Sequence, residues 1–118
     1  AKGVAYADPA AGTSAGKVID RMLSAQEFSG VKRVPVQGLA VGGLSSGKAD
    51  IALQMLPELA ANKDVTLAGP VPAAYGAGVE FSAGIAKQSD QAKSLVGFLA
   101  GPEATALWRA NGLEKVAR

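Results

Sequence analysis

The sequence predicts an α/β fold in which a mixed sheet of about five strands, mostly parallel, is flanked by helices. Short apolar runs alternate along the chain with segments of helical periodicity, which is typical of βαβ units. Hydrophobic residues make up 48% of the chain and charged residues 19%, so the chain can build a core and is not expected to be disordered. Its 118 residues support one domain rather than two.

The first elements expected are a strand over residues 3–7 and a helix over 14–25. The strand segment is a short apolar run. In the helical segment the apolar residues recur at spacings of three and four and share one face. They are Ala15, Val18, Ile19, Met22 and Leu23. A turn rich in small residues joins the strand to the helix.

The middle of the chain predicts two further strands with a short helix between them. Residues 31–36 form the first strand, and Pro35 within it favours an edge position because proline donates no ladder hydrogen bond. Residues 38–46 form a helix weakened by three glycines, with Gly47 as its terminating residue. Residues 50–55 form the next strand.

The remaining part predicts a helix over 57–61, a strand over 65–68 and the longest strand of the chain over 78–86. Two terminal helices follow. The first is capped by Ser89 or Asp90, and the second starts at Pro102, a residue favoured at the first helical position. We divide the chain into an α/β lobe, residues 1–86, and the C-terminal helices, residues 87–118.

The composition excludes several classes of chemistry. The chain has no cysteine and no histidine, which removes disulfides, thiol catalysis, Cys/His zinc sites and Ser-His-Asp triads. We expect no metal, no cofactor and no catalytic residue. The basic residues are scattered and form no stripe, so nucleic acid is not an expected partner. No apolar run reaches the length of a membrane span, and no signal peptide is visible.

The turn over residues 8–16 is the strongest local indication of a site. Small residues after a strand and before a helix leave backbone N–H groups uncovered, and the helix dipole favours an anion there. Gly12, Thr13, Ser14 and Ala15 are the residues concerned, and the two hydroxyls stand at the expected N-cap. The alternative is an ordinary capped helix after a glycine turn. Asp8 is interpreted as a turn-stabilising residue rather than a catalytic acid.

Residues 42–48 match the spacing of a phosphate-binding P-loop, but the match fails in two respects. Ala49 replaces the Ser or Thr that would hold magnesium. The segment also leads from a helix into a strand, whereas a P-loop joins a strand to a helix. We interpret Lys48 as a cation at a helix end or in a solvated loop.

Seven stretches together resemble the substrate-binding proteins of bacterial ABC importers, in the molybdate-binding-like branch of the type II periplasmic binding fold. They are VAYADPA (4–10), TSAG (13–16), SGKADIALQ (46–54), LAGPVP (67–72), AKSLVGFL (92–99), GPEA (101–104) and GLE (112–114). No single stretch is specific, but their order and spacing are those of the family.

The resemblance implies a two-lobed, periplasmic or extracellular protein of which this chain is the C-terminal half. Its expected partners are a small anionic solute, the missing N-terminal lobe and the membrane permease of an ABC importer. The strand at 78–86 would be the antiparallel member of the sheet. The terminal helices would pack either on this lobe or on the missing one. In the second case they would expose apolar faces in this chain, and a swapped homodimer would cover them.

The resemblance also assigns residues. In molybdate binders a backbone N–H near Ala15 and a segment near residues 40–41 contact the anion, and a tyrosine follows the third strand. Here that last position falls at Gln54 or Met55. This departure leaves another oxyanion or a small carboxylate as compatible as molybdate. Gln54 is either a ligand donor or an amide whose hydrogen bonds are satisfied at the end of the strand, and as a donor it joins Gly12, Thr13, Ser14 and Ala15 as an expected ligand-binding residue.

Two other functions stay open on the same fold. One is an isomerase of a small unsaturated carboxylate, whose base would be Asp8, Glu58, Lys48 or a group outside this chain. The other is the effector-sensing domain of a transcription regulator, which would need a helix-turn-helix segment that this chain does not contain.

Overall fold

The computed structural model describes residues 2–116 and divides into two units, Ala1–Val79 and Glu80–Arg118. The strands and α-helices of the first unit are β1 (Val4–Ala7), α1 (Ser14–Leu23), β2 (Arg33–Val36), α2 (Val41–Ser45), β3 (Ile51–Ala52) and α3 (Leu56–Ala60). Three 3₁₀ turns accompany them, namely η1 (Pro9–Ala11), η2 (Gln26–Phe28) and η3 (Ala73–Tyr75). The second unit contains α4 (Asp90–Ala100) and α5 (Pro102–Ala110).

The sheet is parallel and its strands lie in the order β2-β1-β3. Val4 of β1 is in register with Arg33 of β2 on one side and with Ile51 of β3 on the other. The central strand is buried, while the flanking strands are at the edges, as Pro35 in β2 requires. The parallel arrangement and the edge position of the second strand confirm the prediction.

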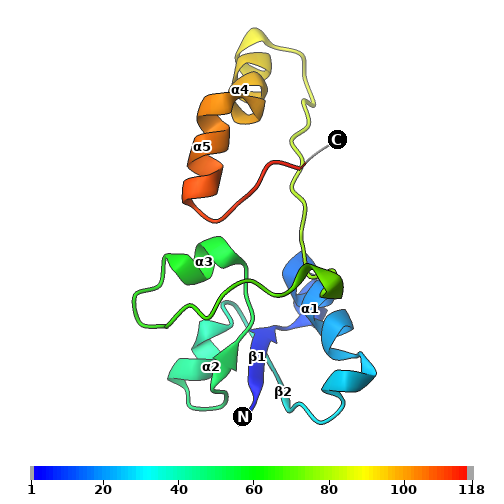
Figure 1. Ribbon diagram of the computed structural model, residues 1–118. Helices are drawn as coiled ribbons and strands as arrows, with labels where there is room; N and C mark the ends of the chain where they lie inside the picture. The colour runs from blue at the N-terminus through cyan, green and yellow to red at the C-terminus, as the bar shows by residue number, and fades with distance from the viewer. Residues whose placement is uncertain (1, 117–118) are drawn as a thin grey trace. The chain divides into compact units, whose positions relative to one another are not determined.

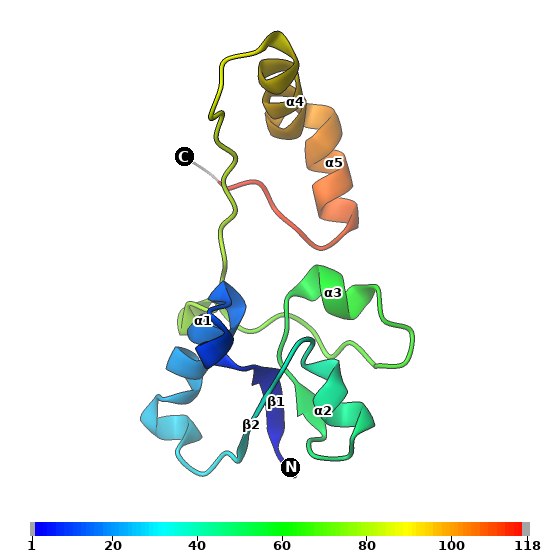
Figure 2. The same ribbon diagram turned by 180° about the vertical axis from the view of Figure 1, so that it is seen from behind.

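Helices α1 and α2 cover opposite faces of this sheet (Figures 1 and 2). Alternate residues of a strand point to opposite faces, and β1 follows that rule. On one face, Val4 and Tyr6 pack against the apolar stripe of α1, which consists of Ile19, Met22 and Leu23. On the other face, Ala5 is fully buried, and a Cβ at Gly43 of α2 would collide with its methyl group.

The prediction of about five strands is wrong for the described part of the chain, where the sheet has three. Residues 65–68 and 78–86 lie outside any strand. An apolar run becomes a strand only where a neighbour offers its N–H and C=O groups. Leu67 and Phe81 in these segments remain 44% and 73% exposed, so neither segment is packed as a strand. The expected antiparallel member is absent among the described residues for the same reason.

Two elements are shorter than the sequence predicts. The third strand covers only Ile51–Ala52, because beyond the bond from Leu53 N–H to Ala5 C=O the chain turns away from β1. The helix expected over 38–46 begins only at Val41, because Gly38 has a left-handed backbone with φ of 77°.

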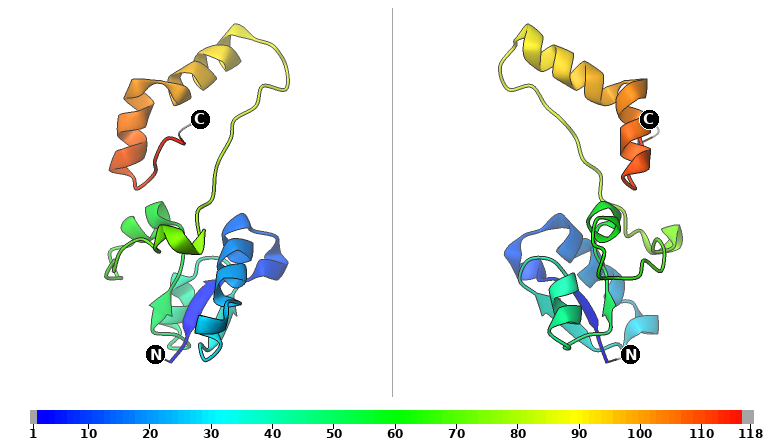
Figure 3. Two further views of the ribbon diagram at one scale, coloured as in Figure 1. Left: turned by 45° about the vertical axis from the view of Figure 1, so that its right-hand side comes forward. Right: turned by 90° about the vertical axis from the view of Figure 1, so that its left-hand side faces the viewer.

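The second unit is a helical pair joined at Gly101, where the two helices meet at a bend (Figure 3). Ser89 Oγ accepts a hydrogen bond from Ala92 N–H at 3.0 Å, and Pro102 stands in the first turn of α5, both as predicted. Trp108 Nε1 donates to the C=O of Leu99 at 3.1 Å and ties α5 to α4. The two units are divided after Val79, and the boundary of the α/β lobe after residue 86 stays a prediction.

Candidate functional site

The strand order creates a crevice between β1 and β3. The connection from β1 through α1 leads to β2 on one side, and the next connection through α2 crosses to β3 on the other side. The loops that follow β1 and β3 therefore separate at the carboxyl end of the sheet. Open α/β sheets hold their ligands at such a switch point.

A small pocket of about 40 Å³ lies at this place in the first unit. It is lined by Ala15, Val18, Ile19, Leu53, Gln54, Met55, Val71, Ala77 and Val79. Helix α1 supplies the first three residues, the chain after β3 the next three, and the irregular segment after α3 the rest. A water molecule needs roughly 10–15 Å³ of such space, so the pocket has room for one small group rather than for a whole solute.

Gln54 is the one polar side chain in this lining. Its Oε1 and Nε2 atoms are both buried, and neither has a hydrogen-bond partner among the described residues. A buried amide without partners costs free energy, and native proteins retain few such groups. The amide is therefore the strongest indication in the described part of the chain of a group that awaits a ligand.

The first turn of α1 borders the same pocket through Ala15. Thr13 is the N-cap, and its Oγ1 accepts a hydrogen bond from Gly16 N–H at 3.2 Å, while its C=O accepts one from Lys17 N–H. The N–H groups of Ser14 and Ala15 have no acceptor within the helix, because the first turn of any helix lacks one. They carry the positive end of the helix dipole.

Gly16 lets this turn approach the sheet closely. A Cβ at this position would lie 2.6 Å from the C=O oxygen of Ala7 and 2.8 Å from Thr13 Oγ1. The preceding turn is fixed by Asp8, whose Oδ1 accepts from Ala10 N–H at 2.9 Å and whose Oδ2 accepts from Gln37 Nε2 at 2.8 Å. Asp8 therefore has the turn-stabilising role predicted for it.

The structure brings together two of the five expected site residues. Ala15 and Gln54 both line the pocket. Gly12, Thr13 and Ser14 are exposed around the start of α1 and do not line the pocket. Gly12 has a left-handed backbone with φ of 81° and ends η1.

Sequence reasoning missed the contribution of Val71, Ala77 and Val79 to the lining. They lie in a stretch without periodicity, where no local pattern marks a residue as pocket-lining. The P-loop interpretation of residues 42–48 stays excluded, since α2 ends at Ser45 and Gly47 terminates it with φ of 69°.

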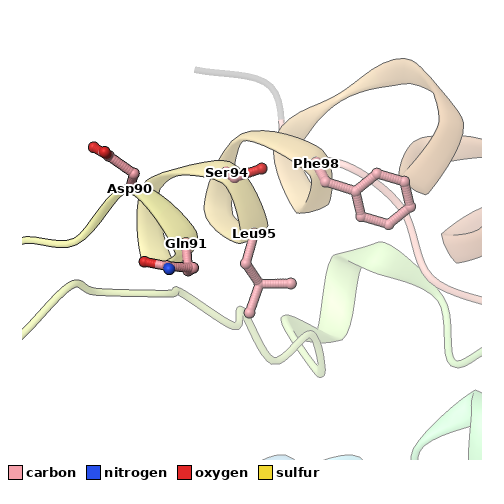
Figure 4. A pocket seen from close by; sticks show the side chains of 5 residues that line it. All are labelled: Asp90, Gln91, Ser94, Leu95 and Phe98. Carbon is pink, nitrogen blue, oxygen red and sulfur yellow. The ribbon is translucent and has the colours of Figure 1, made fainter.

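A second hollow lies along α4 and is lined by Asp90, Gln91, Ser94, Leu95 and Phe98 (Figure 4). All of these side chains come from a single helix. Gln91 and Leu95 project to one side of it, and Asp90 and Ser94 project elsewhere. No unpartnered buried polar atom marks this hollow, so it does not define a site.

Neither a metal cluster nor a membrane span is found in residues 2–116. No three carboxylates among them gather as metal ligands. None of the helices in that range is long and apolar enough to cross a bilayer.

An open parallel sheet with an apolar pocket and an unpaired amide at its switch point is typical of ligand-binding α/β proteins. Over residues 2–114 the chain matches the model of the bacterial extracellular solute-binding proteins, and it belongs to that family. Comparisons with curated proteins and with solved structures give no significant match. The family membership confirms the predicted solute-binding class and agrees with an extracellular or periplasmic location.

Proposed function

We propose that the chain binds a small anionic solute, an oxyanion or a small carboxylate, as part of the substrate-binding protein of an ABC importer. The observation that carries the proposal is the first turn of α1, whose N–H groups have no acceptor within the helix and which borders the pocket that contains Gln54 at the β1–β3 switch point. The solute-binding family membership supports it. The other side chains of the lining are apolar, which favours binding without chemistry.

In this proposal the anionic group of the solute lies at the start of α1. The N–H groups of Ser14 and Ala15 donate to it, and the exposed hydroxyl of Ser14 adds a third donor. Lys17, the fourth residue of α1, is exposed and adds positive charge near the start of the helix. These donors recognise negative charge without a buried cation.

The proposal includes the partners that the resemblance to ABC importers implies. A second lobe of the same protein closes on the solute, the location is periplasmic or extracellular, and the loaded protein docks on a membrane permease. In the molybdate-like branch the ligand is an oxyanion. A swapped homodimer is the alternative way to cover the exposed apolar side chains of the terminal helices, such as Leu95 and Leu107.

The test is a titration of the chain with molybdate, sulfate and succinate, followed by the backbone amide resonances in NMR. At least one anion is expected to shift the Ser14 and Ala15 amides. Ser14→Pro removes two of the three donors, the N–H and the hydroxyl of Ser14. It does so at the first helical position, where proline is tolerated and where Thr13 already has the extended backbone that a following proline requires.

Ser14→Pro is therefore expected to weaken binding by at least roughly a hundredfold, the loss of two charge-assisted hydrogen bonds, while the fold is kept. Asp90→Pro is the matched control, because it makes the same change at the first position of α4. If no anion moves the amides of Ser14 or Ala15, the proposed function is wrong.

A further inference from the structure

The pocket that contains Gln54 differs in chemistry from the start of α1. Its lining holds no ionisable side chain, and the amide is surrounded by groups such as Val18, Leu53 and Met55. An ion in such a lining would lose its hydration without gaining a counter-charge. The group that enters this pocket must therefore be uncharged.

Both ends of the Gln54 amide are buried and unpartnered. The Nε2 atom can only donate and the Oε1 atom can only accept. A tetrahedral oxyanion without protons offers acceptors alone, so it would satisfy Nε2 and leave Oε1 buried without a donor. A group that presents a donor and an acceptor side by side satisfies both atoms at once.

From this geometry we infer that Gln54 determines specificity, and that it selects solutes bearing a neutral donor–acceptor group, a carboxamide above all, in addition to their anionic group. The inference rests on the proposed function, since the anionic end of the same solute lies at Ser14 and Ala15. The pocket volume of about 40 Å³ suits this role, because a water-sized group needs roughly 10–15 Å³ and a carboxamide has three non-hydrogen atoms.

The test compares three probes on this chain: succinamate, butyrate and molybdate. Succinamate carries a carboxylate and a carboxamide, butyrate lacks the amide, and molybdate lacks any donor. Succinamate is expected to shift the side-chain NH₂ resonances of Gln54 together with the Ala15 amide, and to bind at least roughly tenfold more tightly than butyrate. The NH₂ signals are assigned as those absent from the Gln54→Met variant.

Gln54→Met is also expected to abolish the preference for succinamate over butyrate and to raise the melting temperature of the free chain. The rise follows because an unpaired buried amide is replaced by an apolar side chain of similar shape. If the amide served only to stabilise the fold, Gln54→Met would lower the melting temperature instead. Gln26→Met is the control, since Gln26 is exposed on η2 and its change is expected to alter neither property.

Three results would overturn the inference. Equal affinity for succinamate and butyrate, with the Ser14 and Ala15 amides still responding, leaves the proposed function intact and removes the role of Gln54. If the NH₂ resonances of Gln54 show contact with a bound water and no probe shifts them, water satisfies the amide. A chain in which no probe moves Ser14, Ala15 or Gln54 refutes both proposals.

Discussion

Tyr6 links the central strand to the polar side of α1. Its ring is 2% exposed and its hydroxyl donates to Asp20 Oδ1 at 2.7 Å. Arg33 of β2 reaches the same carboxylate at 3.4 Å and also donates to the C=O of Leu23 at 2.7 Å. Burial, and then the hydrogen bond to the Asp20 carboxylate, raise the pKa of Tyr6 to about 12.

This raised pKa makes the stability of the chain sensitive to alkaline pH. An unfolded Tyr6 ionises near its ordinary pKa of 10, but a folded one ionises near 12. The contribution of Tyr6 to the free energy of unfolding is therefore complete below pH 10 and is lost as the pH rises from 10 to 12. The two-unit shift corresponds to about 3 kcal/mol. Urea unfolding at several pH values checks this, and Tyr6→Phe is expected to flatten the decline.

Tyr75 provides the internal comparison, since the chain has only two tyrosines. The neighbouring Glu27 carboxylate raises the pKa of Tyr75 as well, but this ring is 40% exposed. Tyr75→Phe is therefore expected to leave the alkaline decline in place. A decline that disappears with Tyr75→Phe and persists in Tyr6→Phe contradicts the assignment.

Thr13 has a structural role apart from any ligand, because its side chain caps α1. Thr13→Ala is expected to cost about 1 kcal/mol of the free energy of unfolding, the usual loss of an N-cap. Thr13→Ser retains the accepting oxygen and is expected to lose little. Urea unfolding measures both variants, and faster amide exchange at Gly16 in Thr13→Ala alone would locate the loss at the cap.

At the level of elements, the approach of α1 to β1 depends on the absence of a side chain at Gly16. The obstacle to a Cβ there is the C=O of Ala7 at 2.6 Å, and backbone cannot move aside as a flexible side chain can. Gly16→Ala is expected to destabilise the fold by about 1–3 kcal/mol. It is also expected to weaken solute binding, because the neighbouring residue Ala15 lines the pocket.

Gly42 in α2 offers the matched control. It is helical, and a Cβ there would meet nothing within 4 Å. Gly42→Ala is therefore expected to stabilise the chain by about 0.5–1 kcal/mol through the lower entropy of the unfolded state. The two variants are compared by urea unfolding. Equal effects at both glycines would show that the contact with Ala7 is unimportant.

The elements that the sequence predicts well are those with a local cause. Helix α1 follows from one apolar face and the Thr13 cap, and α5 from Pro102 at its start. The segments at 65–68 and 78–86 were predicted from apolar runs alone. Whether such a run joins a sheet depends on partners elsewhere in the fold, which composition does not reveal.

The candidate site divides along the same line. The donors of the first turn of α1 are visible in sequence because small residues and a cap mark them. The unpaired amide of Gln54 is not visible in sequence. Its burial depends on Val71, Ala77 and Val79, which lie in a segment without hydrophobic periodicity. Topology brings the two together, and only the strand order β2-β1-β3 shows that they share one crevice.

At the scale of the whole molecule, the two units differ in how much core they contain. Among the described residues, the buried apolar side chains of the first unit include the five that form its core cluster: Val4, Tyr6, Ile19, Met22 and Leu23. In the second unit Ala104 is buried, while Leu95, Phe98 and Leu107 are 58%, 46% and 56% exposed. Local stability follows the amount of buried apolar contact.

Hydrogen exchange of the chain is therefore expected to separate the two units. Amides of β1 and α1 exchange only through unfolding of the first unit, whereas those of α4 and α5 open more often and exchange faster. Ile19→Ala, which removes core contacts worth about 2–5 kcal/mol, is expected to accelerate exchange in β1 and α1 and to leave α4 and α5 unchanged. Mass spectrometry of peptides from each helix measures this. The contrary result is equal protection in all helices, together with exchange that Ile19→Ala accelerates in all of them. That result would show that the two units unfold as one cooperative body.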